Sequence, residues 1–231
     1  MKRSRLLSIL MVCILIPATL LIGSRLPGRS YYLISTLIIM ETMLPFFFLF
    51  ESRKPQAREL VTIAVLCALA TVSRVAFAFL PSFKPITGII MIAGIAFGAE
   101  AGFLTGAISA FASNFFYTQG AWTPWQMMAY GFGGFLAGLL FHKRKKATHP
   151  VILAIFGFVT IVIAIGPILD LCSVFTVLTN ITMESFGLVL LRGVPANVTH
   201  GVSCAVTMML FSKPLLEKLN RLKVKYGMLD V

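Results

Sequence analysis

The sequence has few charged residues: Lys, Arg, Asp and Glu make up 12% of its 231 positions, against about 25% in a typical soluble domain. Hydrophobic residues make up 58%, and the mean hydropathy is +0.92. Because so few charges cannot cover so much apolar surface, a cytosolic enzyme and a disordered chain are both disfavoured. The net charge of +12 does not indicate a nucleic-acid partner, since the positive residues form short clusters between long apolar runs. We therefore expect an integral membrane protein in contact with the lipid bilayer.

Several motifs of catalysis and metal binding are also absent. The sequence contains no GxxxxGK[ST] nucleotide loop, no HExxH metal motif and no GxSxG elbow. Its cysteines stand in apolar runs without a CxxC pair, at positions 13, 67, 172 and 204. Neither a disulfide framework nor a zinc site is indicated. We expect no cofactor, no metal, no ATPase of the chain's own and no enzymatic activity.

Apolar segments of about the 20 residues that a spanning helix needs recur along the whole chain. They predict an all-α polytopic fold with eight spans, at 6–23, 31–50, 60–80, 86–99, 101–118, 123–141, 150–170 and 186–211. The fourth is short enough to be a half-span buried among neighbouring helices. The stretch 171–185 is interrupted by Asn180 and Glu184, so we predict a structured loop or a short interfacial helix there.

The distribution of lysine and arginine predicts the orientation. With eight crossings and both termini in the cytoplasm, 15 of the 20 basic residues lie in inside segments and three lie outside, which agrees with the positive-inside rule. The first run could instead be a cleaved signal peptide, but it is long and lacks a small-residue cleavage site. Polar residues 51–59 form a hinge. It separates a two-helix N-terminal extension (1–56) from a six-helix core (57–231).

Polar side chains of the predicted spans gather toward their outer ends. Ionisable groups inside a bilayer cost roughly 2.5–3.5 kcal/mol each on insertion scales, so they mark function or a buried partner. The candidates for a ligand site are Arg74, Asn114, Trp122, Trp125, Gln126, Asp170, Arg192, Asn197 and His200. Because the inner halves of the same helices are nearly free of polar side chains, a pocket that opens outward is predicted.

The segment 114–126 combines aromatic residues with side-chain amides and adds Tyr117 and Gln119 to the candidates. Tryptophan and tyrosine also settle at headgroup depth without any binding role. Aromatic walls with a few convergent polar groups are typical of small-molecule sites. We favour a ligand site over a simple aromatic belt.

The last span carries small and polar residues at helical spacing, which places them on one face: Gly193, Asn197, His200 and Cys204. His200 could contact a ligand or form an interhelical hydrogen bond. Arg192 lies about 140° from Asn197 on an ideal helix. It could therefore pair with Asp170 or Glu184 instead of contacting a ligand.

Small residues predict close helix packing in three other spans. They are Ala64, Cys67, Ala68 and Thr71 in the third span, Gly102, Gly106 and Ala110 in the fifth, and Gly134 and Gly138 in the sixth. Such stripes serve packing within one chain or contact with another subunit.

The segment from Arg58 to Phe141 resembles the substrate-binding (S) components of energy-coupling-factor (ECF) transporters, which import vitamins and related micronutrients in prokaryotes. The matching stretches are REL at 58–60, Ala64 with Ala68, FKPITGI at 83–89, GAEAGFLTGAISAFASNFF at 98–116, QGAWTPWQM at 119–127 and GFLAGLLF at 134–141. Asp170, LLRGVPANVTH at 190–200 and KYG at 225–227 extend the similarity to the C-terminal part. The N-terminal pair of helices is a departure from the family pattern.

This resemblance implies a six-helix core in a prokaryotic cell membrane that binds its substrate on the outer side. It implies docking on a membrane coupling subunit carried by two ABC-type ATPases, with Ala64 and Ala68 at the docking face. The sequence as a whole resembles family members tied to the uptake of cobalamin (corrinoids) or of queuosine precursors. We favour cobalamin or another corrinoid as the ligand, with a queuosine precursor as the alternative. Two other functions stay open: a self-sufficient secondary carrier, and a membrane enzyme that uses His200 and Asp170.

Overall fold

A computed structural model describes residues 14–23, 31–142, 144, 149–178 and 181–227, and all regular structure in these ranges is helical. The elements are α2 (Ile16–Gly23), α3 (Tyr31–Ser52), α4 (Ala57–Ala76), α5 (Ile86–Phe97), α6 (Ala99–Tyr117), α7 (Trp122–Phe141), α8 (Pro150–Thr160), the π-helix η3 (Ile161–Ile165), α9 (Gly166–Val177) and α10 (Met183–Tyr226). Of the first predicted span, only the part from residue 14 lies within the described residues. Cys13 and Asn180 lie outside them.

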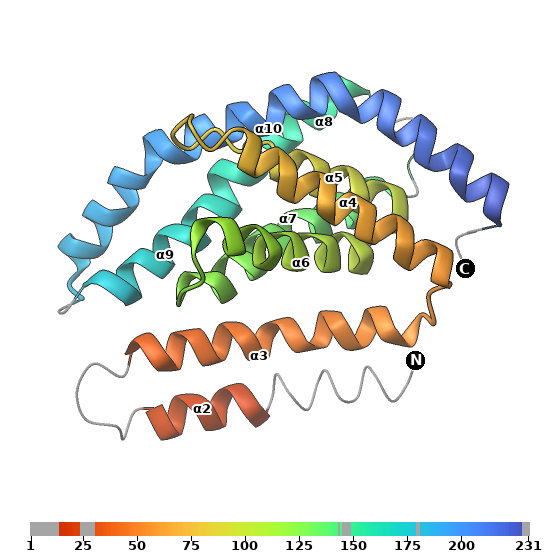
Figure 1. The fold of residues 1–231 in the computed structure, drawn as a ribbon. Coiled ribbons are helices and arrows are strands. Elements are labelled where there is room, and N and C mark those ends of the chain that lie inside the picture. The colour runs from red at the N-terminus through yellow and green to blue at the C-terminus, as the bar shows by residue number, and fades with distance from the viewer. Residues whose placement is uncertain (1–13, 24–30, 143, 145–148, 179–180, 228–231) are drawn as a thin grey trace.

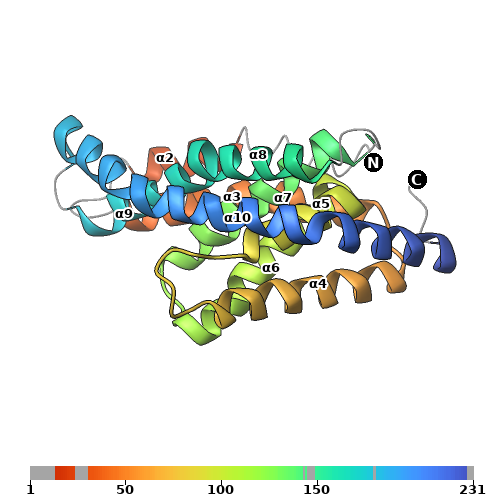
Figure 2. The ribbon, with the colours of Figure 1, turned by 90° about the horizontal axis from the view of Figure 1, so that it is seen from above.

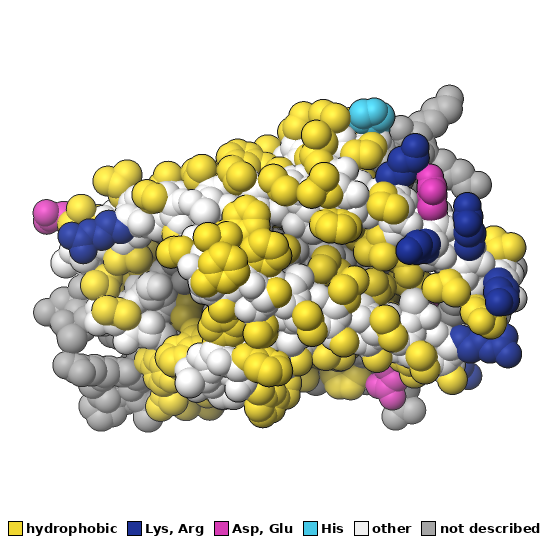
Figure 3. All heavy atoms as spheres, turned by 45° about the horizontal axis from the view of Figure 1, so that its top comes forward, with side chains coloured by type: hydrophobic (Ala, Val, Ile, Leu, Met, Phe, Trp, Pro, Cys, Tyr) yellow, Lys and Arg dark blue, Asp and Glu magenta, His cyan; other side chains and the backbone are white. Residues whose placement is uncertain are grey.

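The helices form layers that run along one common direction (Figures 1 and 2). In Figure 1, α10 arches over the top, α4 to α7 fill the middle, and α3 with α2 lies beneath them. The C-terminal ends of α3 and α10 and the beginning of α4 lie at the same end of the bundle. Exposed lysine and arginine side chains gather at this end in Figure 3. We call it the basic end; it carries Arg58, Lys213, Lys218, Arg221 and Lys225.

Helix α5 occupies the centre of the core. All of its 12 residues are buried, as expected of a helix that is apolar on every side. At about 1.5 Å per residue it spans roughly 18 Å, well short of the roughly 30 Å hydrocarbon core. The prediction of a short, protein-buried segment at 86–99 is therefore confirmed.

Three basic side chains cover the carbonyl end of α5. Arg53 donates to the carbonyl oxygen of Phe97 (3.2 Å), and Lys223 donates to that of Ala96 (2.7 Å). His142 Nδ1 lies 2.9 Å from the carbonyl oxygen of Ile95. The last carbonyls of a helix have no partner within the helix and carry partial negative charge. These three side chains, from the segment after α3, the end of α7 and α10, supply the missing donors.

The prediction of a loop or short interfacial helix at 171–185 is wrong. Pro150–Val177 is continuously helical through the π-helical turn η3, and α10 already begins at Met183. Thr182 starts α10 with a capping box: its hydroxyl accepts from the Ser185 amide (3.1 Å), and its own amide donates to the Ser185 hydroxyl (2.9 Å). Glu184 is thus in the first turn of a helix, where a carboxylate is favourable.

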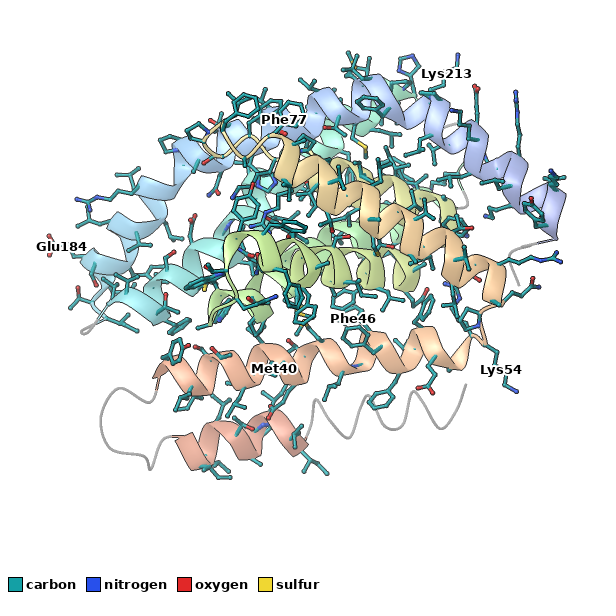
Figure 4. The ribbon with its side chains drawn as sticks, in the orientation of Figure 1. Met40, Phe46, Lys54, Phe77, Glu184 and Lys213 are labelled. Carbon is teal, nitrogen blue, oxygen red and sulfur yellow. The ribbon has the colours of Figure 1, made fainter. Side chains whose placement is uncertain are left out.

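The N-terminal helix α3 packs on α6 and α7 through aromatic side chains. Phe46 stacks on Phe103 of α6 at 4.0 Å between ring centroids and meets Phe135 of α7 edge-on at 5.1 Å. Figure 4 labels Phe46 on the side of α3 that faces these helices. Arg53, just beyond α3, forms ion pairs with Glu59 (3.3 Å) and Glu100 (3.6 Å). The extension is therefore joined to the core by ring packing along its length and by charge at the basic end.

Four helical stretches in the described residues are long and apolar enough to cross a membrane: Tyr32–Ser52, Ala57–Ala76, Pro150–Val177 and Met183–Tyr226. Helices α6 and α7 have 19 and 20 residues and are not among these four. The all-helical membrane fold is confirmed. The count of eight spans and the cytoplasmic termini stay predictions.

Candidate functional site

A cavity of about 240 Å³ lies among the loop after α4, the first turns of α7, the helix α9 and the N-terminal half of α10. Figure 1 places these elements away from the basic end. It is lined by Ser82, Lys84, Trp122, Gln126, Leu169, Asp170, Cys172, Ser173, Ala196, Asn197 and His200. Five of the predicted site residues thus lie around one cavity: Trp122, Gln126, Asp170, Asn197 and His200.

The pair Asp170 and Asn197 forms one wall. Asn197 Nδ2 donates to Asp170 Oδ2 at 2.7 Å. Two glycines make room for the pair: a Cβ on Gly193 would collide with the Asp170 carboxylate, and a Cβ on Gly166 would collide with the Asn197 amide. The absence of side chains at these positions allows α9 and α10 to approach while their polar groups stay between them.

His200 lies deeper, at the floor of the cavity. It is 4% exposed, and its Nε2 lies 3.2 Å from the Thr87 hydroxyl of α5. The ring of Tyr130 meets it edge-on at 6.0 Å. Cys204, one turn further along the predicted stripe, is fully buried and contacts the sulfur of Met91. His200 therefore has the predicted interhelical partner and also borders the cavity, and its contact with a ligand stays a prediction.

Arg74 does not line the cavity, although sequence reasoning placed it in the site. It is 4% exposed and donates through Nη1 to the Ser113 hydroxyl and to Asn114 Oδ1 (3.0 Å). Its guanidinium lies over the ring of Tyr117 at 4.6 Å, and the Tyr117 hydroxyl donates to its carbonyl oxygen at 2.9 Å. Arg74 and Tyr117 thus link α4 to α6 through a hydrogen bond and a cation–π contact.

The side-chain amides predicted around 114–126 have different positions, since some bond to other protein groups only and one lines the cavity. Asn114 Nδ2 donates to Thr123 Oγ1 (3.0 Å) and to Gln126 Oε1 (2.9 Å). Gln119 donates to the Phe111 carbonyl oxygen (3.0 Å) and accepts from the Thr123 hydroxyl (2.9 Å). Only Gln126 of these amides lines the cavity.

The two tryptophans also differ. Trp122 lines the cavity and is 43% exposed. Trp125 is 4% exposed, stacks on Phe175 of α9 at 5.8 Å between ring centroids, and is not part of the lining. Trp122 is therefore a partly exposed aromatic residue of the cavity lining, and Trp125 packs α7 against α9.

Arg192 lies away from the cavity and is exposed. Within the part of the chain that the structure describes, it forms no ion pair with Asp170 or Glu184. The predicted angular separation from Asn197 explains its position. The structure does not bring Arg192 into the candidate site.

Sequence reasoning missed the polar lining residues Ser82, Lys84 and Ser173. Lys84 had a signal: it is one of only three basic residues in the predicted outer segments, and it falls in the FKPITGI stretch. Ser82 and Ser173 had none, since single serines in apolar segments are common in helical membrane proteins. Among the described residues, no group of three or more His, Cys, Asp or Glu side chains could hold a metal ion.

The predicted small-residue stripe of α4 divides into two faces. Cys67 and Thr71 are buried against α6, where they lie 3.7 Å and 3.4 Å from the carbonyl oxygens of Thr105 and Ser109. Ala64 and Ala68 are exposed. Exposed valines flank them at positions 61, 65 and 72. This part of α4 therefore presents an apolar surface that no other described part of the chain covers.

A family model described as "ECF-type riboflavin transporter, S component" matches residues 54–217, which are 164 of the 231 residues. The matched range includes every residue that lines the cavity and excludes α2 and α3. Comparison with curated proteins and with solved structures gives no match.

Proposed function

Because this chain belongs to the family of ECF-type riboflavin transporter S components, we propose that it is the flavin-binding subunit of an ATP-driven importer. S components are integral membrane proteins that bind a transport substrate and are not enzymes. They work with a membrane coupling (T) component and ATPases. The specific proposal is that the cavity beside Trp122 and Asp170 binds riboflavin or a closely related flavin. The cavity and its lining, within the matched range, are the observation that carries it.

The chemistry of the lining supports a planar ligand with polar edges. Trp122 provides an aromatic face on which a flat ring system can stack. The isoalloxazine ring of a flavin carries an N–H donor between two carbonyl acceptors. The wall formed by Asp170 and Asn197, together with Lys84, offers acceptors and donors for such an edge.

The expectation of cobalamin is not supported. The family description names riboflavin. A corrinoid is several times larger than an isoalloxazine, whereas the cavity measures about 240 Å³. Pockets for small molecules usually measure about 300–1,000 Å³, so this one suits the smaller ring system better.

The orientation and the docking face complete the proposal. The basic end faces the cytoplasm by the positive-inside rule, so the cavity at the opposite end faces outward. The exposed Ala64 and Ala68 of α4 form the face on which the coupling subunit packs, because small side chains allow helix backbones to approach closely. Among the described residues, α3 packs on α6 and α7 and leaves this face of α4 exposed.

Riboflavin binding to the purified chain tests the ligand. Because flavin fluorescence is quenched on stacking against tryptophan, titration of the detergent-solubilised protein with riboflavin should give saturable quenching. Trp122→Ala should lose most of it, and Val198→Ala, on an exposed part of α10, should not. Saturable binding of cobalamin in place of riboflavin would contradict the ligand assignment.

Reconstitution tests the mode of transport. Liposomes that contain the chain together with its coupling subunit and ATPases should accumulate riboflavin when ATP is supplied inside. Liposomes that contain the chain alone should not, with or without an ion gradient. Uptake driven by an ion gradient in the chain alone would show a secondary carrier.

A further inference from the structure

Arg74 is a buried cation whose hydrogen-bond partners are neutral. Its side chain is 4% exposed, and in the described residues no carboxylate lies within ion-pair distance of it. The groups that it contacts are the Ser113 hydroxyl, Asn114 Oδ1 and the rings of Tyr117 and Tyr130. A charge at this depth is costly. It therefore needs an explanation beyond packing.

The chemistry of a guanidinium fixes the orientation of Asn114. A guanidinium has five N–H donors and no acceptor, so the Asn114 atom that faces Arg74 must be its oxygen. The Asn114 NH₂ group then points to Thr123 Oγ1 and Gln126 Oε1, at 3.0 and 2.9 Å. Reversing this amide would place N–H groups against the guanidinium and an oxygen against Gln126 Oε1, so both of these hydrogen bonds would be lost.

The branch through Thr123 satisfies the same direction. The Thr123 hydroxyl accepts from Asn114 and from the Gly120 amide (3.2 Å), so its own hydrogen is free to donate to Gln119 Oε1 (2.9 Å). Gln119 Nε2 then donates to the carbonyl oxygen of Phe111 (3.0 Å). In this branch every N–H and O–H group donates and every oxygen that is contacted accepts, without conflict. Such networks hold their side chains rigidly.

The branch through Gln126 reaches the cavity. Because Asn114 donates to Gln126 Oε1, that oxygen faces Asn114, and the Nε2 group on the other side of the amide is left as a donor for the cavity that the residue lines. On the opposite wall, Asn197 donates through Nδ2 to the Asp170 carboxylate. The Asn197 oxygen and the second carboxylate oxygen are left as acceptors there.

We propose that Arg74 is a positioning residue that sets the hydrogen-bonding polarity of the ligand cavity through Asn114 and Gln126. The cavity presents a donor at Gln126 and acceptors at Asp170 and Asn197. It selects ligands that carry an acceptor on one edge and an N–H donor on the other. That the ligand is a flavin rests on the proposed function. The direction of the hydrogen bonds from Arg74 through Asn114 to Gln126 does not depend on it.

The isosteric change Asn114→Asp separates this role from a structural one. The new carboxylate accepts from Arg74 as the amide oxygen did, and it adds an ion pair. However, it cannot donate to Gln126, whose amide then turns its N–H groups toward it and presents its oxygen to the cavity. We expect a folded protein whose thermal unfolding midpoint is not lowered and whose affinity for riboflavin falls about tenfold, the usual effect of one misdirected hydrogen bond.

A double-variant cycle tests the route. Gln126→Leu alone should also weaken riboflavin binding about tenfold, and adding Gln126→Leu to Asn114→Asp should cost nothing further, because both remove the same donor. Combining Asn197→Ala with Asn114→Asp should weaken riboflavin binding by the product of the two single fold-changes. Wild-type affinity in Asn114→Asp, or full additivity with Gln126→Leu, would overturn the proposal.

Hydrogen exchange of the side-chain amides tests the hydrogen-bonded series Arg74, Asn114 and Gln126 without any ligand. In ¹⁵N-labelled protein, the Asn114 amide hydrogens should exchange slowly with water, and those of Gln126 should exchange faster. Arg74→Met should increase exchange at Asn114, and Arg74→Lys, which retains a donor-only cation, should increase it less. Unchanged exchange in Arg74→Met would overturn the proposal even if riboflavin binds. Failure of the wild-type chain to bind riboflavin would instead refute the ligand assignment.

Discussion

The helices of the central bundle are held together differently at its two ends. At the cavity end, α4, α6 and α7 are joined by side chains, in the sequence Arg74, Asn114, Gln126. Toward the basic end, α5, α6 and α7 meet backbone to backbone. A Cβ on Gly102 would collide with the carbonyl group of Gly134 and approach the Gly94 Cα to 2.7 Å.

This difference explains where a cavity can form. Long polar side chains hold helices apart and direct hydrogen bonds between them. Glycines remove the space between helices and leave no room for a ligand. Helices α6 and α7 therefore take part in both arrangements, in side-chain links near the cavity and in close backbone packing toward the basic end.

The largest effect is expected where backbones touch. Gly102→Leu places four carbon atoms where the Gly134 carbonyl lies, and no flexible neighbour can move aside. Overpacking of this kind costs roughly 3 kcal/mol or more, so we expect loss of the monodisperse folded protein in size-exclusion chromatography. Gly187→Leu, where a Cβ meets nothing within 4 Å, is the matched control and should remain folded. Normal folding of Gly102→Leu would contradict the close backbone packing of α6 on α7 toward the basic end.

The next effect concerns the exposed face of α4. Ala68→Trp should abolish ATP-driven uptake, because a bulky ring prevents close approach of the coupling subunit, and Ala64→Trp should behave alike. Riboflavin binding should stay within about twofold of wild type, since neither residue lines the cavity. Ile155→Trp, at an exposed position on α8, should preserve both activities. Loss of binding in Ala68→Trp would show that the two ends are not independent.

A smaller, selective effect is expected in the cavity. Trp122→Ala and Asn197→Ala should weaken riboflavin binding about 10- to 100-fold, as expected from the loss of a stacking or hydrogen-bonding partner worth about 1.4–2.8 kcal/mol. Isothermal titration measures the change. Phe115→Ala, an exposed aromatic residue outside the cavity, should bind normally. If Trp122→Ala also lowers the thermal midpoint sharply, its role is packing.

The smallest effect concerns the charges that fasten the N-terminal extension. Arg53→Gln removes the ion pairs to Glu59 and Glu100, which are partly exposed. Pairs of this kind contribute about 0–1 kcal/mol each, so the thermal midpoint should fall slightly and riboflavin affinity should not change. A loss of binding would mean that the basic end controls the cavity.

The sequence was sufficient for much of the architecture because apolar periodicity and length dominate in a membrane protein. The buried half-length helix α5 followed from 86–99 alone. The prediction of a loop or short interfacial helix at 171–185 failed because Asn180 and Glu184 were both taken as interruptions. Asn180 lies outside the described residues, and the capping box at Thr182 makes Glu184 a normal first-turn residue. Hydropathy counts polar residues and does not distinguish a helix terminus from a break.

The candidate site was predictable only in part for a related reason. Depth along a helix places a residue near the right end of the bundle, and this was enough for Trp122 and Asn197. The direction of a side chain depends on how neighbouring helices are rotated, and no single-sequence pattern gives this rotation. Gln119 and Trp125 therefore lie behind the cavity, and Lys84 enters it from a loop.

The continuity of α10 has a mechanical consequence. Its 44 residues follow about 66 Å of helix axis, which curves over the core (Figure 1). The helix carries His200 beside the cavity and Lys223 at the carbonyl end of α5, about 35 Å apart along the axis. Pro214 stands between these two residues, and a proline inside a helix removes a backbone hydrogen bond and permits a bend. We therefore expect α10 to flex at Pro214, so that a small movement beside the cavity leaves the Lys223 hydrogen bond to α5 intact.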